Sequence, residues 1–121
     1  MHKIDTILQH LLGRKYVIQE STSNGWNYVL YSNKRIEAHK HIELSANSTV
    51  TSIIQYTPFT MANTNYDVQA TPGHNFTVVD KYGISDTNTQ DTRTTSQFLF
   101  TVTLTSVYPT GWDLSLKGYI A

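Results

Sequence analysis

Hydrophobic and polar positions alternate along most of the chain from Lys15 to the C-terminus. The clearest example is Arg35–Leu44, in which every second side chain is polar. The side chains of the other, largely apolar row are Ile36, Ala38, Lys40, Ile42 and Leu44. A repeat of two residues places the two rows on opposite faces of a strand, so this segment is predicted to form a half-buried antiparallel strand.

Two later segments repeat this alternation. Gln97–Thr105 carries Phe98, Phe100, Val102 and Leu104 on one face, and Trp112–Ile120 carries Trp112, Leu114, Leu116 and Ile120. Gly118 continues the inward row of the last strand. The missing side chain predicts that another backbone or an aromatic ring lies close to Gly118.

Weaker strands are expected between these segments, and turn residues separate them. The expected strands are Lys15–Glu20, Trp26–Tyr31, Thr49–Tyr56, Tyr66–Ala70 and Phe76–Asp80. The turns are Asn24-Gly25, Asn33-Lys34, Pro72-Gly73 and Pro109-Thr110-Gly111. Lys81–Thr95 is rich in Asp, Thr and Asn and is interpreted as an exposed loop. About eight short strands with frequent turns predict an all-β fold, an antiparallel β-sandwich or jelly roll.

The first residues follow a different pattern. Apolar side chains recur at spacings of three and four residues, and Gly13 follows them; they are Ile4, Ile7, Leu8, Leu11 and Leu12. This pattern predicts a short N-terminal helix over residues 1–14, before a sandwich binding domain over residues 15–121. A helix of about ten residues needs a packing partner. That partner is either its own domain or two further copies in a trimeric coiled stalk.

Composition narrows the classes of function. The chain has 121 residues, which fits one domain, and its nine basic residues balance its nine acidic residues. Zero net charge argues against a protein that binds nucleic acid, and against one that docks on an anionic membrane by electrostatic attraction. The chain lacks cysteine, any apolar run of membrane-spanning length and a signal-peptide pattern. Charged residues make up only 15% of the chain, so much of the surface must be neutral and polar, which suits a face covered by other subunits.

No motif of a nucleophilic, phosphate-binding or metal-dependent enzyme occurs in the sequence, and no cofactor is expected. The chain is therefore interpreted as non-enzymatic. Glycosidase carboxylates can come from distant strands, so a paired-carboxylate site stays open as an alternative.

The candidate ligand-binding residues lie in and beside the Lys81–Thr95 loop. They combine carboxylates, an aromatic ring and a guanidinium: Asp80, Tyr82, Asp86, Asp91 and Arg93. Loops carry recognition more often than strands do. The competing interpretation, a solvated connector, is equally compatible with this composition. Trp26 and Tyr28 share one strand face and are assigned to the core.

His39 and His41 share the polar face of the Arg35–Leu44 strand, about 7 Å apart by strand rise. Three such pairs around a threefold axis would offer six nitrogens to one transition metal. One pair alone is short of the ligands of an ordinary metal site. The favoured interpretation is therefore that both histidines are solvated or form hydrogen bonds between subunits, and no metal site is predicted within one chain.

The segment 25–38 resembles a hairpin near the C-termini of tail-fibre and minor structural proteins of bacteriophages that infect Gram-positive bacteria. The residues that fill the pattern are Trp26, Tyr28, Tyr31, Asn33 and Glu37. The end of the chain, residues 110–119, is similar to the closing strand of those domains. Leu30 stands where the pattern has a basic residue, and Lys34 stands where it has glycine, so the ligand here can differ.

The resemblance implies a receptor-binding head of a phage tail fibre or baseplate. Such a head is a homotrimer in the virion, at the tail tip or baseplate, assembled in the host cytoplasm beside other tail or baseplate proteins. The resemblance also implies host adhesion by carbohydrate binding, to a cell-wall saccharide such as polysaccharide or teichoic acid. Two alternatives remain: a non-viral carbohydrate-binding or lectin-like β-sandwich module, and a purely structural virion protein.

Overall fold

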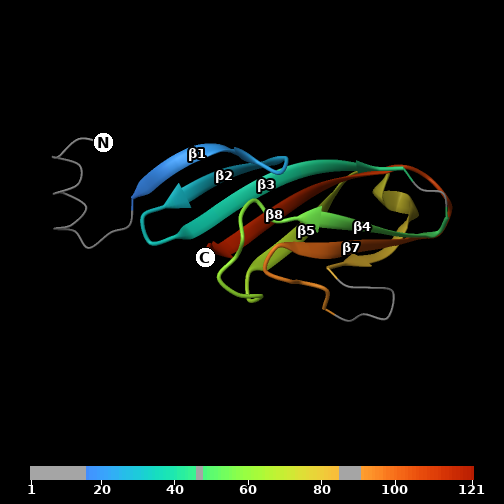
Figure 1. Cartoon of the computed structure of the whole chain (residues 1–121). Coiled ribbons are helices and arrows are strands. Elements are labelled where there is room, and N and C mark those ends of the chain that lie inside the picture. Colours follow the sequence, from blue (N-terminus) through green and yellow to red (C-terminus); the bar gives the residue numbers. More distant parts are fainter. Residues whose placement is uncertain (1–15, 46–47, 85–90) are drawn as a thin grey trace.

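The computed structural model describes residues 16–45, 48–84 and 91–121, and these form two antiparallel sheets (Figure 1). The elements are β1 (Val17–Ser23), β2 (Trp26–Tyr31), β3 (Arg35–Leu44), β4 (Val50–Tyr56), β5 (Asp67–His74), the 3-10 turn η1 (Phe76–Val78), β6 (Val79–Gly83), β7 (Gln97–Leu104) and β8 (Thr110–Tyr119). The larger sheet has the order β1-β2-β3-β8-β5, and the smaller has the order β4-β7-β6. The prediction of an all-β, antiparallel fold is confirmed.

The first three strands form a meander through two tight turns. At Asn24-Gly25 both residues have positive φ, 50° and 83°, which suits the right-handed twist of the paired strands. Lys34, with φ 68°, closes the second turn, where its backbone N–H donates to the carbonyl oxygen of Tyr31 at 3.0 Å. Both turns were predicted from the sequence.

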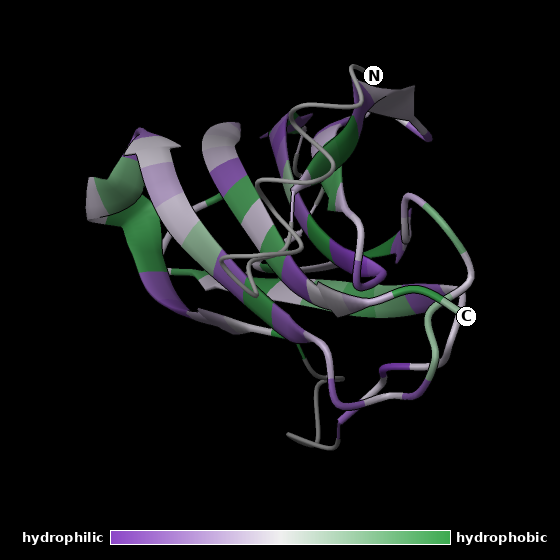
Figure 2. Ribbon diagram, turned by 90° about the vertical axis from the view of Figure 1, so that its left-hand side faces the viewer, coloured by the Kyte–Doolittle hydropathy of each residue, from purple (hydrophilic) through white to green (hydrophobic). Residues whose placement is uncertain are grey.

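The inward rows of the two sheets meet in one core. The larger sheet contributes Trp26, Tyr28, Ile36, Ala38, Trp112, Leu114 and Leu116, and β7 contributes Phe98, Phe100, Val102 and Leu104. Figure 2 shows hydrophobic and hydrophilic residues alternating along the strands, as a sheet with one buried face requires. The rows predicted for β3, β7 and β8 therefore point inward, and Lys40, in the middle of the β3 row, is half-buried.

Aromatic contacts bridge the sheets. The Trp26 ring meets Phe98 edge-on, with centroids 6.2 Å apart, and the Phe100 and Trp112 rings lie 5.1 Å apart. Trp26 Nε1 also donates to the carbonyl oxygen of Tyr56 at 2.7 Å, which joins β2 of the larger sheet to β4 of the smaller. The assignment of Trp26 and Tyr28 to the core is confirmed, since both are buried.

Gly118 lies where the sequence predicted a close approach. A Cβ added to it would lie 2.7 Å from Tyr66 Cβ and 3.0 Å from Met61 Cε. Tyr66 is buried, and its hydroxyl donates to the carbonyl oxygens of Thr94 and Gln97. The glycine thus lets the segment before β5 pack directly on β8.

Several predicted boundaries are wrong, for local reasons. The expected strand Phe76–Asp80 begins as a 3-10 turn, because Asn75 takes a left-handed conformation and donates to the carbonyl oxygen of Pro109. Lys81–Gly83, expected in a loop, pairs with β7 as part of β6. Pro72-Gly73, expected as a break, lies within β5, an edge strand that can admit a proline, and the register shifts between Pro72 and His74.

The last strand begins earlier than predicted. Thr110 and Gly111, expected in a turn, pair with Leu44 and Glu43 at the start of β8. The expected N-terminal helix over residues 1–14 lies outside the described residues. None of the helical segments in the described ranges has the length and apolar character to cross a membrane.

Candidate functional site

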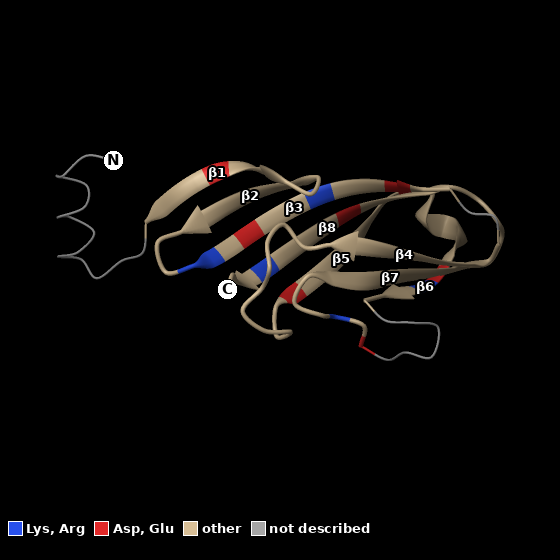
Figure 3. Ribbon diagram, in the orientation of Figure 1, with Lys and Arg blue, Asp and Glu red and all other residues tan. Residues whose placement is uncertain are grey.

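Most of the charged residues in the strands belong to the five-stranded sheet (Figure 3), whereas β4 and β7 have none. The difference follows from the polar rows in the sequence. β3 alone directs Arg35, Glu37, His39, His41 and Glu43 to the outward face of this sheet. The polar rows of β1, β2 and β8 lie beside them through the strand register.

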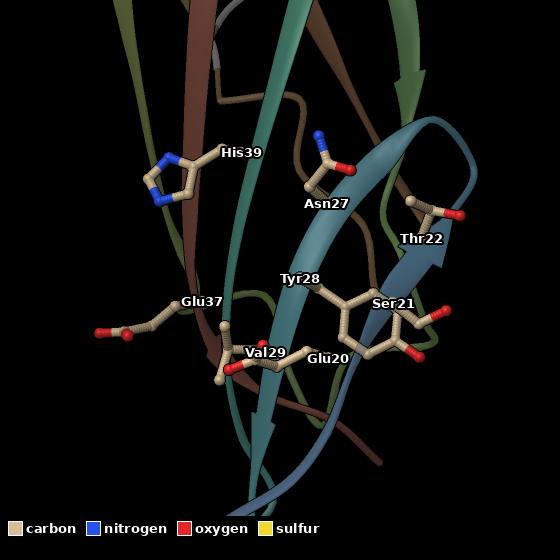
Figure 4. A pocket seen from close by; sticks show the side chains of 8 residues that line it. All are labelled: Glu20, Ser21, Thr22, Asn27, Tyr28, Val29, Glu37 and His39. Atoms are coloured by element: carbon tan, nitrogen blue, oxygen red, sulfur yellow. The ribbon is translucent and has the colours of Figure 1, made fainter.

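A shallow hollow of about 420 Å³ opens on this face over β1, β2 and β3. Its lining residues are Glu20, Ser21, Thr22, Asn27, Tyr28, Val29, Glu37 and His39, shown in Figure 4. All of them come from the meander whose turns are set by Asn24-Gly25 and Asn33-Lys34. The hairpin sequence therefore builds the hollow directly.

Two cross-strand rows form the hollow. In the first, Val29 lies between its cross-strand partners, Glu20 of β1 and Glu37 of β3. In Figure 4 the Glu20 side chain lies beside Val29, and the Glu37 side chain extends away from it. Because neighbouring strands are about 4.8 Å apart, the backbones of the two glutamates are separated by roughly 10 Å. The separation leaves room for a small ring above Val29.

The second row offers neutral polar groups. Asn27 lies between Thr22 and His39, which supplies an amide, a hydroxyl and an imidazole side by side. These groups together can both donate and accept hydrogen bonds. The amide, hydroxyl and imidazole groups thus complement the carboxylates of the first row, which only accept hydrogen bonds when they are ionised.

Glu37 is fixed in position by two neighbours on the same face. The Tyr31 hydroxyl donates to Glu37 Oε2 at 2.8 Å, and Arg35 Nη2 lies 3.6 Å from Glu37 Oε1. The hydrogen bond to Glu37 is the largest cause that raises the pKa of Tyr31 above its ordinary value. The Glu37 carboxylate is therefore oriented before any ligand arrives.

A second hollow of about 340 Å³ continues the first toward β8 and shares Asn27 and His39 with it. Its further lining residues are Lys40, His41, Asp113 and Leu114. The two hollows together are called the polar trough below. The polar trough crosses β1, β2, β3 and β8, over roughly 14 Å by strand spacing.

At its β8 end the polar trough meets a chain of ionisable side chains. His41 Nδ1 lies 2.8 Å from Asp113 Oδ1, and His41 Nε2 lies 2.7 Å from Glu43 Oε1. Glu43 Oε2 lies 3.2 Å from His74 Nε2, and the His74 ring covers Gly111, where a Cβ would overlap it. The hydrogen bonds to Glu43 and then to Asp113 raise the pKa of His41 above 6.5.

Lys40, at the same end, is held by the β1–β2 hairpin. Its Nζ donates to the carbonyl oxygen of Asn24 at 3.3 Å and lies 5.8 Å from the centroid of the Trp26 ring. Partial burial lowers the pKa of Lys40. The ammonium group of Lys40 therefore already has contacts within the chain.

His39 and His41 lie on the same polar face, as predicted. Among the residues that the structure describes, no group of three or more His, Asp or Glu side chains is placed to hold a metal ion. A metal on a threefold axis would need partner chains and stays a prediction.

The residues predicted to bind ligand are not brought together at the polar trough. Asp80 and Tyr82 lie on β6 of the other sheet, where the Tyr82 ring lies 4.7 Å from that of Trp112. Asp86 lies outside the described residues. Asp91 and Arg93 form an ion pair, with Arg93 Nη2 2.6 Å from Asp91 Oδ2.

Arg93 has structural partners as well. Its Nη1 donates to the carbonyl oxygen of Tyr66, and its guanidinium carbon lies 5.9 Å from the centroid of the Tyr66 ring. The hydrogen bond from Arg93 is the largest cause that lowers the pKa of Asp91. This pair holds the segment before β7 against the core, and its role in ligand binding stays a prediction.

Sequence reasoning missed Glu20, Thr22, Asn27 and Val29 as members of one site. The preference for loops drew attention to residues 80–93 instead. The signal was present in the sequence, because the Asn24-Gly25 turn sets which outward residues of the two flanking strands lie opposite each other.

An apolar floor with neighbouring carboxylate, amide, hydroxyl and imidazole groups suits a ligand rich in hydroxyl groups. The C–H face of a sugar ring can pack on Val29, and its hydroxyls can exchange hydrogen bonds with the planar side chains around it. No protein-family model matches the chain, and searches of curated proteins and of solved structures returned no match.

Proposed function

We propose that this protein is the receptor-binding head of a bacteriophage tail fibre or baseplate, and that it binds a saccharide of the host cell wall without catalysing a reaction. The observation that carries the binding role is the polar trough, with its Val29 floor and two rows of hydrogen-bonding side chains. The phage context rests on the resemblance of residues 25–38 and 110–119 to phage tail proteins.

The strand order supports a jelly-roll arrangement for β3–β8. Successive strands β3, β4, β5 and β6 alternate between the two sheets. On the return, β7 lies between β4 and β6, and β8 lies between β3 and β5. Such an interleaved order is typical of jelly rolls in capsid and lectin domains. The β1–β2 hairpin then extends one sheet and adds the polar trough to it.

The opposite face of the molecule supports the homotrimer. The outward side chains of β4 include Val50, Ile54 and Tyr56, which are 42%, 48% and 57% exposed. β7 presents half-buried Leu99 and Thr103 beside them, without a charge. Contact between subunits through this face would leave each polar trough directed outward. Several weak saccharide sites on one particle then act together through avidity.

The decisive experiment measures retention of the purified protein on cell-wall preparations from a panel of Gram-positive bacteria. We expect retention on at least one wall, lost in the double variant Asn27→Ala, His39→Ala. Gln69→Ala changes an exposed amide on β5 outside the polar trough; it is the matched control and keeps full retention. Circular dichroism checks that each variant is folded.

Two results would contradict the proposal. Retention on none of the wall preparations would favour a purely structural virion protein. Light scattering that gives the mass of a monomer at micromolar concentration would favour the non-viral carbohydrate-binding module.

A further inference from the structure

Carboxylates lie at both ends of the polar trough. Glu20 and Glu37 flank Val29 at one end, and Asp113 lies at the other. Glu20 is exposed on the outermost strand of the sheet. A ligand lying over Val29 and Asn27 therefore passes close to at least two acidic groups.

The cationic groups that line the polar trough are engaged within the chain. Lys40 contacts the carbonyl oxygen of Asn24 and the Trp26 ring. His41 has an acidic oxygen at each ring nitrogen, from Asp113 and Glu43. Arg35 and exposed Lys117 lie beside Glu37 on the same face but outside the lining of the trough. A phosphate group placed over Val29 and Asn27 would meet Glu20 and would have to displace existing contacts to reach Lys40 or His41.

From this charge arrangement we infer that the polar trough takes an uncharged or amine-bearing saccharide and rejects phosphate-rich polymers such as teichoic acid. The inference rests on the proposed function and selects one of the two wall ligands that the sequence resemblance implies. Two like charges 4 Å apart in water repel enough to weaken binding about five-fold, and each further carboxylate near the ligand adds to this. Amino groups on a sugar would instead gain from Glu20, and from Glu37 in competition with its contacts to Tyr31 and Arg35.

The test is a competition on a wall preparation that retains the protein. Wall glycans released from the same preparation are separated by anion exchange into an uncharged or basic fraction and an anionic fraction. The non-anionic fraction is expected to displace the protein. Free polyglycerol phosphate is expected to displace it at least five-fold less effectively, by mass of polymer.

Charge variants sharpen the test. Glu20→Gln is expected to make polyglycerol phosphate about five-fold more effective as a competitor, and Glu37→Gln is expected to act in the same direction. Asp67→Asn is the matched control. It removes one exposed carboxylate from β5, at the far edge of the same sheet face and outside the polar trough. It should leave the competition unchanged.

The outcomes separate the inference from the proposed function. Equal displacement of the native protein by polyglycerol phosphate and by the non-anionic fraction would overturn the inference while saccharide binding stands. A Glu20→Gln variant that behaves like Asp67→Asn would also overturn it. Retention on no wall preparation would reject the proposed function, and the inference would fall with it.

Discussion

His41 of β3 and Asp113 of β8 are direct cross-strand partners, and His41 Nδ1 lies 2.8 Å from Asp113 Oδ1. The other ring nitrogen of His41 lies 2.7 Å from Glu43 Oε1. Ionised carboxylates only accept hydrogen bonds, so both contacts are satisfied when both ring nitrogens carry a proton. The pair therefore links the charge state of His41 to the geometry of the polar trough.

The first prediction concerns pH. The pKa of His41 is raised above 6.5, chiefly by its hydrogen bonds to Glu43 and Asp113. Its contribution to folding stability is therefore fully present below pH 6.5 and is lost as pH rises through the raised pKa. Titration of the His41 ring by NMR should give a midpoint above 6.5, and Asp113→Asn should lower that midpoint. A native midpoint below 6.5 would contradict the contact geometry.

A second prediction concerns the close approach at Gly118. Gly118→Ala places a methyl group 2.7 Å from Tyr66 Cβ, and the packed neighbours must shift to admit it. Overpacking of this kind costs about 1–3 kcal/mol of unfolding free energy. Urea unfolding measures the loss. Lys117→Ala, an exposed change in the same strand, is the control and should lie within about 0.5 kcal/mol of the native protein.

A third prediction concerns a buried amide. Gln55 of β4 points inward and is 4% exposed, and its Oε1 has no hydrogen-bond partner among the described residues. Gln55→Met keeps a similar side-chain shape and removes the unpaired oxygen, which should raise the unfolding free energy by about 1 kcal/mol. The same change at exposed Gln69 should have little effect. Thermal unfolding of both variants measures the difference. An equal shift in melting temperature would show that the burial of Gln55 is not the cause of the stabilisation.

A fourth prediction separates the structural role of Arg93 from its predicted role in ligand binding. Arg93→Ala removes the hydrogen bond to the carbonyl oxygen of Tyr66 and the ion pair with Asp91. We expect a loss of about 1 kcal/mol in unfolding free energy and unchanged retention on cell walls. Lost retention with unchanged stability would instead support the ligand site predicted around residues 80–93.

Sequence patterns were reliable where one face of a strand is buried. β2 and β3 have the predicted bounds, and Gly118 has the predicted close neighbour, because alternation and a missing side chain report directly on packing. Sequence patterns were less reliable where the conformation of a single residue sets the end of a strand. Asn75 in a left-handed conformation and Pro72 on an edge strand each displaced an expected boundary.

The sequence by itself determined that the chain forms antiparallel strands, which residues of the main strands face inward, and where the first two turns lie. These features depend on a two-residue repeat and on local turn chemistry, and both act between near neighbours in the chain. Only the tertiary structure decided that Glu20, Val29, Glu37 and His39 line one hollow, and that Asp113 meets His41. Such groupings depend on which strands pair and in what register, and the pairing of β3 with β8 joins residues more than seventy positions apart.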